Sequence, residues 1–186
     1  MRLRSRRQLS SLLVLFLALA GCRNEKPPLP PGWEALRKAF PLQEAYRYRL
    51  TWVGADSAQG AIEADTLRQV LLADTLWWVL KGHVQAEWAS LSQPTPNRLT
   101  CEEAYLLPQT GLIKAYRTVR VTTATGEILE TDELWWDRTF GRLQAPGWVR
   151  LQTPKEEVRG YTLESTNNLR SYKLRRIQGR IQNPTL

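Results

Sequence analysis

The sequence has few of the residues that metal binding and catalysis require. Its 186 residues include one histidine, His83, and two cysteines, Cys22 and Cys101. One histidine with thiols far from it in the sequence makes no spacing typical of a metal site. No glycine-rich phosphate loop, nucleophile elbow or kinase motif occurs. We therefore expect no metal and no cofactor, and we favour a binding protein over an enzyme.

Long apolar runs are also absent. The apolar stretch at residues 12–20 is far shorter than the ~20 residues that a membrane-spanning helix needs. It follows arginines at positions 2, 4, 6 and 7 and precedes Leu-Ala-Gly-Cys at 19–22, which fits the bacterial lipobox. We predict that residues 1–21 are a lipoprotein signal peptide and that Cys22 carries the acyl chains.

The segment after Cys22 has the composition of a tether. Residues 22–32 are proline-rich and form a semi-rigid spacer, and residues 33–186 are of a length expected for one domain. Because Cys101 is the single cysteine after Cys22, an internal disulfide is excluded. We expect Cys101 to be a small buried residue on a strand.

Acidic residues are missing from the carboxy terminus. Removal of the signal peptide leaves 22 basic and 18 acidic residues, a net charge of +4. Residues 165–186 contain no acid, and their basic residues are Arg170, Lys173, Arg175, Arg176 and Arg180. This charge suits an anionic partner such as a phosphorylated lipid, or a solvated edge strand that charge protects. It does not indicate nucleic acid, because basic and aromatic residues do not alternate as in a known module.

A repeat of 30 residues is the most informative positive feature. Cys-Glu-Glu-Ala-Tyr-Leu at 101–106 aligns with Thr-Asp-Glu-Leu-Trp-Trp at 131–136, and Gly111 aligns with Gly141. The match continues through residues 113–121 and 143–151. A fixed period indicates stacked copies of one supersecondary unit. The unit here is a pair of short strands, which predicts a layered antiparallel structure with a lengthwise interior.

Strand patterns fill the chain after Pro41. The spacing of Trp33, Leu36 and Phe40 predicts a short helix that Pro41 ends. Tyr46, Tyr48, Leu50 and Trp52 then alternate with polar residues, as in a half-buried strand. Further strands are expected at 61–67, 70–80, 83–88, 158–164 and 171–181, with turns at Asp74, 81–82, 108–111, 125–126, 138–141, 146–147 and 167–168 and a loop at 90–98. Gly160 and Gly179 mark bulges or plain turns. The fold class is all-β: a sandwich, jelly roll or open barrel.

Alternation also predicts which side chains face the interior. If Leu134 and Trp136 point inward, then Glu133 and Trp135 point outward. The predicted inner layers are Ile113, Val119, Val121, Leu134, Trp136, Leu143, Ala145, Val149 and Leu151. The same residues would fill a closed core, so the pattern alone does not distinguish a groove from a core. A register slip of one residue across the two tryptophans would invert the assignment.

Four motifs in residues 126–181 carry a family resemblance. They are Thr-Asp-Glu-Leu-Trp-Trp-Asp at 131–137, Gly-Trp-Val-Arg-Leu at 147–151, Glu-Val-Arg-Gly-Tyr-Thr-Leu-Glu at 157–164 and Ile-Gln-Gly-Arg-Ile at 177–181. This region resembles the carboxy-terminal half of LptC, the membrane-anchored periplasmic component of the lipopolysaccharide export ABC transporter. Lys-Gly-His-Val at 81–84 is similar to a short turn of that family. Its best-known members keep a transmembrane helix, whereas this chain has a lipobox.

The resemblance implies a fold and a function. The fold would be a twisted antiparallel β-jelly roll, open along one side, whose interior receives the acyl chains of lipopolysaccharide. The protein would accept lipid from the inner-membrane ABC transporter and pass it to a periplasmic bridge protein of similar fold. Edge strands would join one roll to the next: Tyr46, Tyr48, Leu50 and Trp52 toward the transporter, and Tyr172, Leu174, Ile177 and Ile181 toward the bridge protein. The lipoprotein would face the periplasm from the inner membrane.

Two other function classes stay open. One is a structural or assembly lipoprotein of the outer membrane, which differs in the membrane that retains it. The other is an envelope hydrolase on a β-sandwich, for which Asp74, Asp132 and Asp137 beside aromatic pairs would be the candidate acids. Aspartate at the end of a strand is more often turn chemistry, so the hydrolase ranks last.

Overall fold

A computed structural model describes residues 33–53, 59–90 and 93–181, and their elements all belong to the compact unit Pro31–Leu186. These residues form one helix, α1 (Trp33–Lys38), and a series of strands. The strands are β1 (Pro41–Val53), β2 (Gln59–Leu72), β3 (Thr75–Ser90), β4 (Gln93–Leu107), β5 (Leu112–Thr122), β6 (Ile128–Asp137), β7 (Arg142–Gln152), β8 (Glu156–Thr166) and β9 (Tyr172–Ile181).

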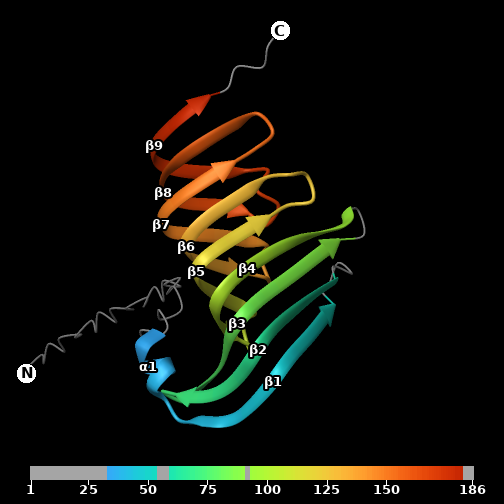
Figure 1. Ribbon diagram of the computed structural model, residues 1–186, viewed down its shortest axis with the longest axis vertical. Coiled ribbons are helices and arrows are strands. Elements are labelled where there is room, and N and C mark those ends of the chain that lie inside the picture. The colour runs from blue at the N-terminus through green and yellow to red at the C-terminus, as the bar shows by residue number, and fades with distance from the viewer. Residues whose placement is uncertain (1–32, 54–58, 91–92, 182–186) are drawn as a thin grey trace, which may run out of the picture. The chain divides into compact units, whose positions relative to one another are not determined.

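The nine strands form one antiparallel sheet in chain order. Each strand pairs with the next, from β1 to β9, so that β1 and β9 are the two edges. Figure 1 shows this succession from β1 (cyan) to β9 (red). The all-β prediction is confirmed: the molecule is an open antiparallel sheet of jelly-roll-like type.

A line of bulges bends the strands near their middles. The pairing register shifts between Thr100 and Glu103 in β4 and between Tyr116 and Val119 in β5, and comparable shifts occur in the pairs β2–β3, β3–β4, β6–β7, β7–β8 and β8–β9. Positive φ angles at Arg117 (64°) and Thr118 (51°) lie in the bend of β5. Bulges bend and twist the strands that carry them. The two halves of each strand therefore turn toward one another, and the sheet folds over its own inner face.

Ring contacts across the interior demonstrate this folding. Strand β3 lies three strands from β6, about 14 Å away at the usual strand spacing. Yet the ring centroids of Trp88 on β3 and Trp136 on β6 are 4.3 Å apart. Trp52 on edge strand β1 lies 6.1 Å from the same ring. These contacts are possible because one half of the sheet packs against the other half.

The 30-residue repeat is a spatial repeat. Strands β4 and β5 form one copy, β6 and β7 the next, and equivalent inward side chains are buried in both copies. The turns at 108–111 and 138–141 stack on each other: the Thr139 hydroxyl donates to the carbonyl of Thr110 (3.0 Å) and Arg138 Nε to that of Gly111 (3.1 Å). Gly111 and Gly141 have φ angles of 71° and 58°, which glycine adopts without strain.

Three turns or loops expected from sequence are wrong. Lys81-Gly82 lies within β3, where Gly82 (φ 73°) and His83 (φ 44°) form its bend. Pro146-Gly147 likewise lies in the bend of β7. The loop expected at 90–98 is largely strand, because β4 begins at Gln93. Turn-forming residues also suit a bulge, so sequence alone does not separate a bend within a strand from a turn between strands.

Most other expected elements are found, but the turn at Asp74 divides the strand expected at 70–80 between β2 and β3, Gly179 pairs with Val158 within β9, and one side chain is misplaced. Turns occur at Asp74, 108–111, 125–126, 138–141 and 167–168, and β8 and β9 form the last pair. Gly160 lies at a register shift in β8, where an added Cβ would come within 2.7 Å of the Arg175 carbonyl. The predicted helix is α1, and its Leu36 is 1% exposed. Phe40, however, lies beyond the helix and is 93% exposed.

Candidate functional site

All nine predicted interior residues lie in one buried cluster. They are Ile113, Val119, Val121, Leu134, Trp136, Leu143, Ala145, Val149 and Leu151. None is more than 2% exposed. Leu134 and Trp136 point inward while Glu133 and Trp135 are half-buried on the outer face, which is the register that alternation favours. Protein side chains fill the interior at these positions, and lipid binding by them stays a prediction.

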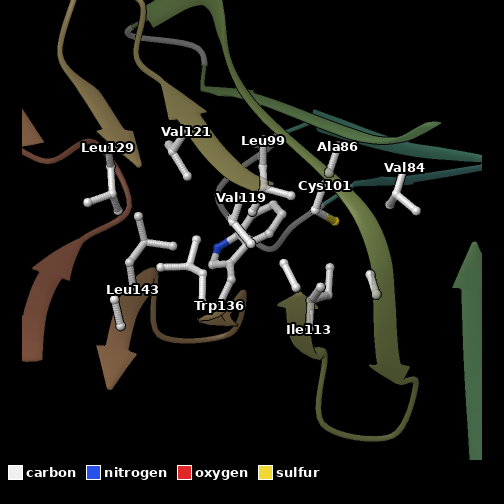
Figure 2. Close-up of a cluster of buried hydrophobic side chains, with 14 of the residues drawn as sticks. Val84, Ala86, Leu99, Cys101, Ile113, Val119, Val121, Leu129, Trp136 and Leu143 are labelled. Atoms are coloured by element: carbon white, nitrogen blue, oxygen red, sulfur yellow. The ribbon is translucent and has the colours of Figure 1, made fainter. Parts of the chain in front are cut away.

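Trp136 is the centre of this interior. Figure 2 shows its ring among Val119, Leu143 and Ile113, with the indole nitrogen surrounded by aliphatic side chains. The indole N–H of Trp136 has no hydrogen-bond partner, and that of Trp88 has none either. A buried donor without an acceptor costs about 1–3 kcal/mol. The interior therefore offers unused donors to any guest molecule that carries a carbonyl or hydroxyl oxygen.

A hollow lies beside this cluster at the β1–β3 end of the sheet. Its volume is about 410 Å³, within the usual range for ligand pockets. Trp52 and Trp88 contribute apolar walls, and Arg49 and Glu87 contribute charge. Gly60 is required here, because a Cβ at this position would lie 2.2 Å from the ring of Trp52. The Arg138 guanidinium lies 4.5 Å from the centre of the same ring.

The predicted amino-terminal contact strand is the β1 edge. Tyr48, Leu50 and Trp52 are half-buried and pack against the interior cluster. The ring of Tyr48 meets that of Trp78 edge-on at 6.0 Å, and burial raises the pKa of the Tyr48 hydroxyl. Tyr46 differs from its three companions: it is 72% exposed, because the bend at Arg47 (φ 54°) changes the face on which side chains emerge.

The predicted carboxy-terminal contact strand is the β9 edge. Tyr172 and Leu174 are half-buried against the interior, Ile177 is 60% exposed, and the backbone of Ile181 pairs with Glu156. The Tyr172 hydroxyl donates to Glu156 (2.6 Å); burial and this hydrogen bond raise its pKa to about 12. Both edges are therefore half-buried strands with one neighbour each in the described sheet.

Sequence reasoning did not find the buried charge on the outer face. Glu103 of β4 is 2% exposed and accepts hydrogen bonds from Arg37 Nε (2.9 Å) and the Tyr105 hydroxyl (2.7 Å). The Lys81 amine lies 3.5 Å away. Burial would raise the pKa of Glu103, but the hydrogen bonds from Arg37 and Tyr105 outweigh it, so the pKa is lowered. No local motif signals this site, since Arg37 and Glu103 are distant in sequence.

This charge cluster attaches α1 to the sheet. Between the helix and the sheet lies an apolar group that we call the helix patch: Leu36 of α1 with Val70, Trp77, Val79 and Tyr105 of the sheet. Arg68 of β2 donates to the carbonyl of Ala39 at the end of the helix (3.2 Å). Figure 1 shows α1 beside the β1–β3 end of the sheet. The first element after the predicted tether is thus fixed to the outer face.

Cys101, His83 and one of the candidate acids, Asp137, have structural surroundings. Burial raises the pKa of the Cys101 thiol to about 12, which leaves it protonated near neutral pH. The Asp137 carboxylate accepts the backbone N–H groups of Thr139 (3.0 Å) and Phe140 (3.1 Å), which is turn chemistry. The exposed His83 contacts Asp65 (2.7 Å). Within the described ranges, no group of three histidine, cysteine or acidic side chains could hold a metal ion.

The predicted signal peptide, Cys22 and the tether to residue 32 lie outside the described residues. Among residues 33–53, 59–90 and 93–181, no helix is long and apolar enough to cross a membrane.

No family model matches the chain. No curated protein matches it at a significant level.

Proposed function

We propose that this protein is a lipopolysaccharide-binding relay of the LptC type. In this role it accepts lipid that an inner-membrane ABC transporter extracts, and passes it to a periplasmic bridge protein of similar fold. The lipid chains occupy the lengthwise interior, and acylated Cys22 anchors the protein. The chain performs no catalysis in this scheme, and ATP hydrolysis by the transporter drives the lipid.

The observation that carries the proposal is a layered apolar interior that runs between two free strand edges. Each repeat adds a layer of the same kind, from Ala115 and Val119 to Ala145 and Val149. A lipid with several acyl chains exposes large apolar area in water, at ~25 cal/mol per Å². An interior that continues from one protein to the next avoids this exposure. Free edges suit such continuity, because strand addition joins sheets end to end.

The filled interior sets a requirement on this mechanism. Trp136 is 2% exposed, and Trp52 from the β1 edge packs against it. A lipid chain can enter only if side chains of the two sheet halves separate. The lipid then replaces protein contacts with its own, and its ester or amide carbonyls can accept from the unpartnered N–H of Trp136. These new contacts and hydrogen bonds offset part of the free energy that separation of the two sheet halves costs.

Photo-crosslinking at adjacent residues tests the proposal. A crosslinking amino acid replaces Trp136 in one full-length variant and Trp135 in another, which serves as the matched outer-face control. We expect capture of lipopolysaccharide at position 136 alone, dependent on ATP and on the transporter, and insensitive to salt. Two results contradict an interior lipid path. One is no lipid capture at either position, and the other is equal capture at both positions that high salt abolishes.

The two edges can be tested in the same way. Crosslinkers at Tyr46 of β1 and at Ile177 of β9 occupy exposed sites on opposite edges. We expect transporter subunits to be captured at position 46 and the bridge protein at position 177. Capture of the same partner at both positions contradicts the proposed direction of transfer.

A structural or assembly lipoprotein of the outer membrane is the second candidate. The closed packing around Leu134 and Leu143, both fully buried, favours it, because such a core needs no guest. Fractionation of the two membranes distinguishes the candidates: retention in the outer membrane, with no lipid capture at position 136, supports the second.

A further inference from the structure

A row of exposed side chains crosses the last three strands on the outer face. Trp148 of β7 pairs with Tyr161 of β8, which pairs with Arg175 of β9. Directly opposed residues of antiparallel strands lie on one face of the sheet. That face is the outer one, because Val149, the neighbour of Trp148, is buried in the interior. We call Trp148, Tyr161 and Arg175 the outer row.

Both aromatic rings of the outer row are exposed to solvent. Trp148 is 41% exposed and Tyr161 is 47% exposed. Trp135, an aromatic residue on the outer face of β6, differs because it has polar partners: its indole N–H donates to Glu133 (2.6 Å), and the Lys114 amine lies 3.7 Å from its ring centre. In the described part of the chain, the indole N–H of Trp148 and the Tyr161 hydroxyl have no such partner.

The β9 end of the outer row carries a cluster of cations without ion pairs. Lys173, Arg175 and Arg176 of β9 are exposed, and none forms an ion pair with a described residue. Glu164 is opposite Lys173, yet no ion pair joins them. On strands β5 to β8, by contrast, arginines and glutamates form a continuous ladder of ion pairs: Arg120 with Glu130, Glu130 with Arg150, and Arg150 with Glu157. The described cations of the β9 edge therefore lack the ion pairs that the cations of the neighbouring strands form.

We propose that the outer row and its flanking cations dock on the anionic headgroup surface of a lipid bilayer. Tryptophan and tyrosine favour the boundary between water and hydrocarbon because one end of each ring system is apolar and the other polar. Lysine and arginine are attracted to anionic headgroups. An acidic partner strand would instead use the backbone of the β9 edge and would leave the two rings uncovered. This contact goes beyond the relay function and does not depend on it.

The test measures how close the outer row comes to lipid. Gln178, exposed on β9 and paired with Arg159 of the outer face, is replaced by cysteine in the full-length protein and labelled with a fluorophore. Gln43, an exposed glutamine on the opposite edge strand, receives the same label as a matched control. Cys101 is buried and its thiol is protonated, so it does not react. Both proteins are reconstituted into vesicles of phosphatidylglycerol and phosphatidylethanolamine that contain a headgroup nitroxide quencher.

We expect quenching at position 178 and much less at position 43, since the tether is common to both. Replacing phosphatidylglycerol with phosphatidylcholine, or raising the salt, should remove the difference. The double variant K173E with R175E loses two cations that contact headgroups. The ratio of docked to undocked protein should therefore fall by at least roughly 30-fold. The control is the double variant F140A with R142E. It changes an exposed aromatic residue and a nearby cation beside the 138–141 turn, where Arg142 lies 6.0 Å from the Phe140 ring centre. This variant should leave quenching unchanged.

Three outcomes overturn the proposal. Equal quenching at the two labels shows no preferred face. Quenching that survives both charge reversal and the loss of anionic lipid removes the electrostatic basis. Absence of quenching in vesicles, with protection of the label when the bridge protein is added, assigns the outer row to a protein partner. Lipid capture at position 136 is read separately, so a failure here leaves the proposed relay intact.

Discussion

The helix patch and the outer row both lie on the outer face of the sheet, but they differ in whether other residues of the chain cover them and pair with their charges. The helix patch is covered by α1, and its one buried acid, Glu103, has Arg37 and Tyr105 as partners. Among the described residues, no element covers the outer row, and the exposed cations of β9 beside it form no ion pair. The first region is thus complete within the chain. The second needs water or a partner, and the predictions below test this difference.

The largest effect is expected from Arg37→Met. This change leaves the buried Glu103 carboxylate with the more distant Lys81 as its remaining cation. Loss of one partner of a buried ion pair costs about 3–5 kcal/mol. Urea unfolding should show a decrease toward the lower end of this range. Arg175→Met, the matched change in the outer row, should alter stability by less than ~0.5 kcal/mol. Equal losses of stability in the two variants would contradict the difference between the two regions.

Leu36→Ala tests the apolar part of the same attachment. Leu36 is 1% exposed between α1 and the sheet, so truncation should cost about 2–3 kcal/mol through lost burial and a cavity. Phe40→Ala is the control, because Phe40 is 93% exposed only four residues later. Thermal unfolding compares the two variants. A loss at Phe40 that matches the loss at Leu36 contradicts the docking of α1 through Leu36.

The pH dependence of Glu103 sharpens the comparison further. Its pKa in the folded protein is lowered, so its contribution to stability is complete above the unfolded value of about 4.3. That contribution is lost as the pH falls through the lower, folded pKa. The stability difference between the wild type and Glu103→Gln should therefore be constant near neutral pH and shrink in acid. A difference that grows with acidification contradicts the assigned sign. Urea titrations at several pH values measure it.

Trp148→Ala should have the smallest effect on folding. Its side chain is 41% exposed and has no polar partner in the described structure, so the expected loss of stability is below ~1 kcal/mol. Its effect should appear in vesicle docking instead. Trp135→Ala, which removes a ring that Lys114 covers, should cost more in stability and less in docking. The reverse ranking contradicts the assignment of a binding role to the outer row.

Much of the interior could be predicted because strand geometry is periodic. Inward residues recur at every second position, so Leu134 and Trp136 could be assigned together. The 30-residue offset then extends the assignment from Val149 to Val119. Prediction fails where the period breaks. At Tyr46, a bulge changes the face of the sheet on which the side chain lies. In β3 and β7, the strand continues through a bulge where the sequence predicts a turn, because the same residue types form bulges and turns.

The outer-face charge site could not be predicted for a different reason. Arg37 and Glu103 are 66 residues apart, and neither belongs to a motif. Their contact depends on where α1 lands on the sheet, which long-range packing decides. The cations of β9 could be found from sequence, but whether they form ion pairs depends on the side-chain arrangement of the folded sheet: Glu164 lies opposite Lys173 without pairing with it.

The sequence by itself determined the all-β class, the repeated strand pairs and the inward residues of the repeated strands, because these follow from local alternation and a fixed period. Only the tertiary structure decided that the sheet folds at its bulges, that Trp52 and Trp88 meet Trp136, and that α1 covers one part of the outer face. These contacts join residues far apart in the chain. Their free energy comes from burial that exists only after the sheet closes on itself, and no local pattern encodes it.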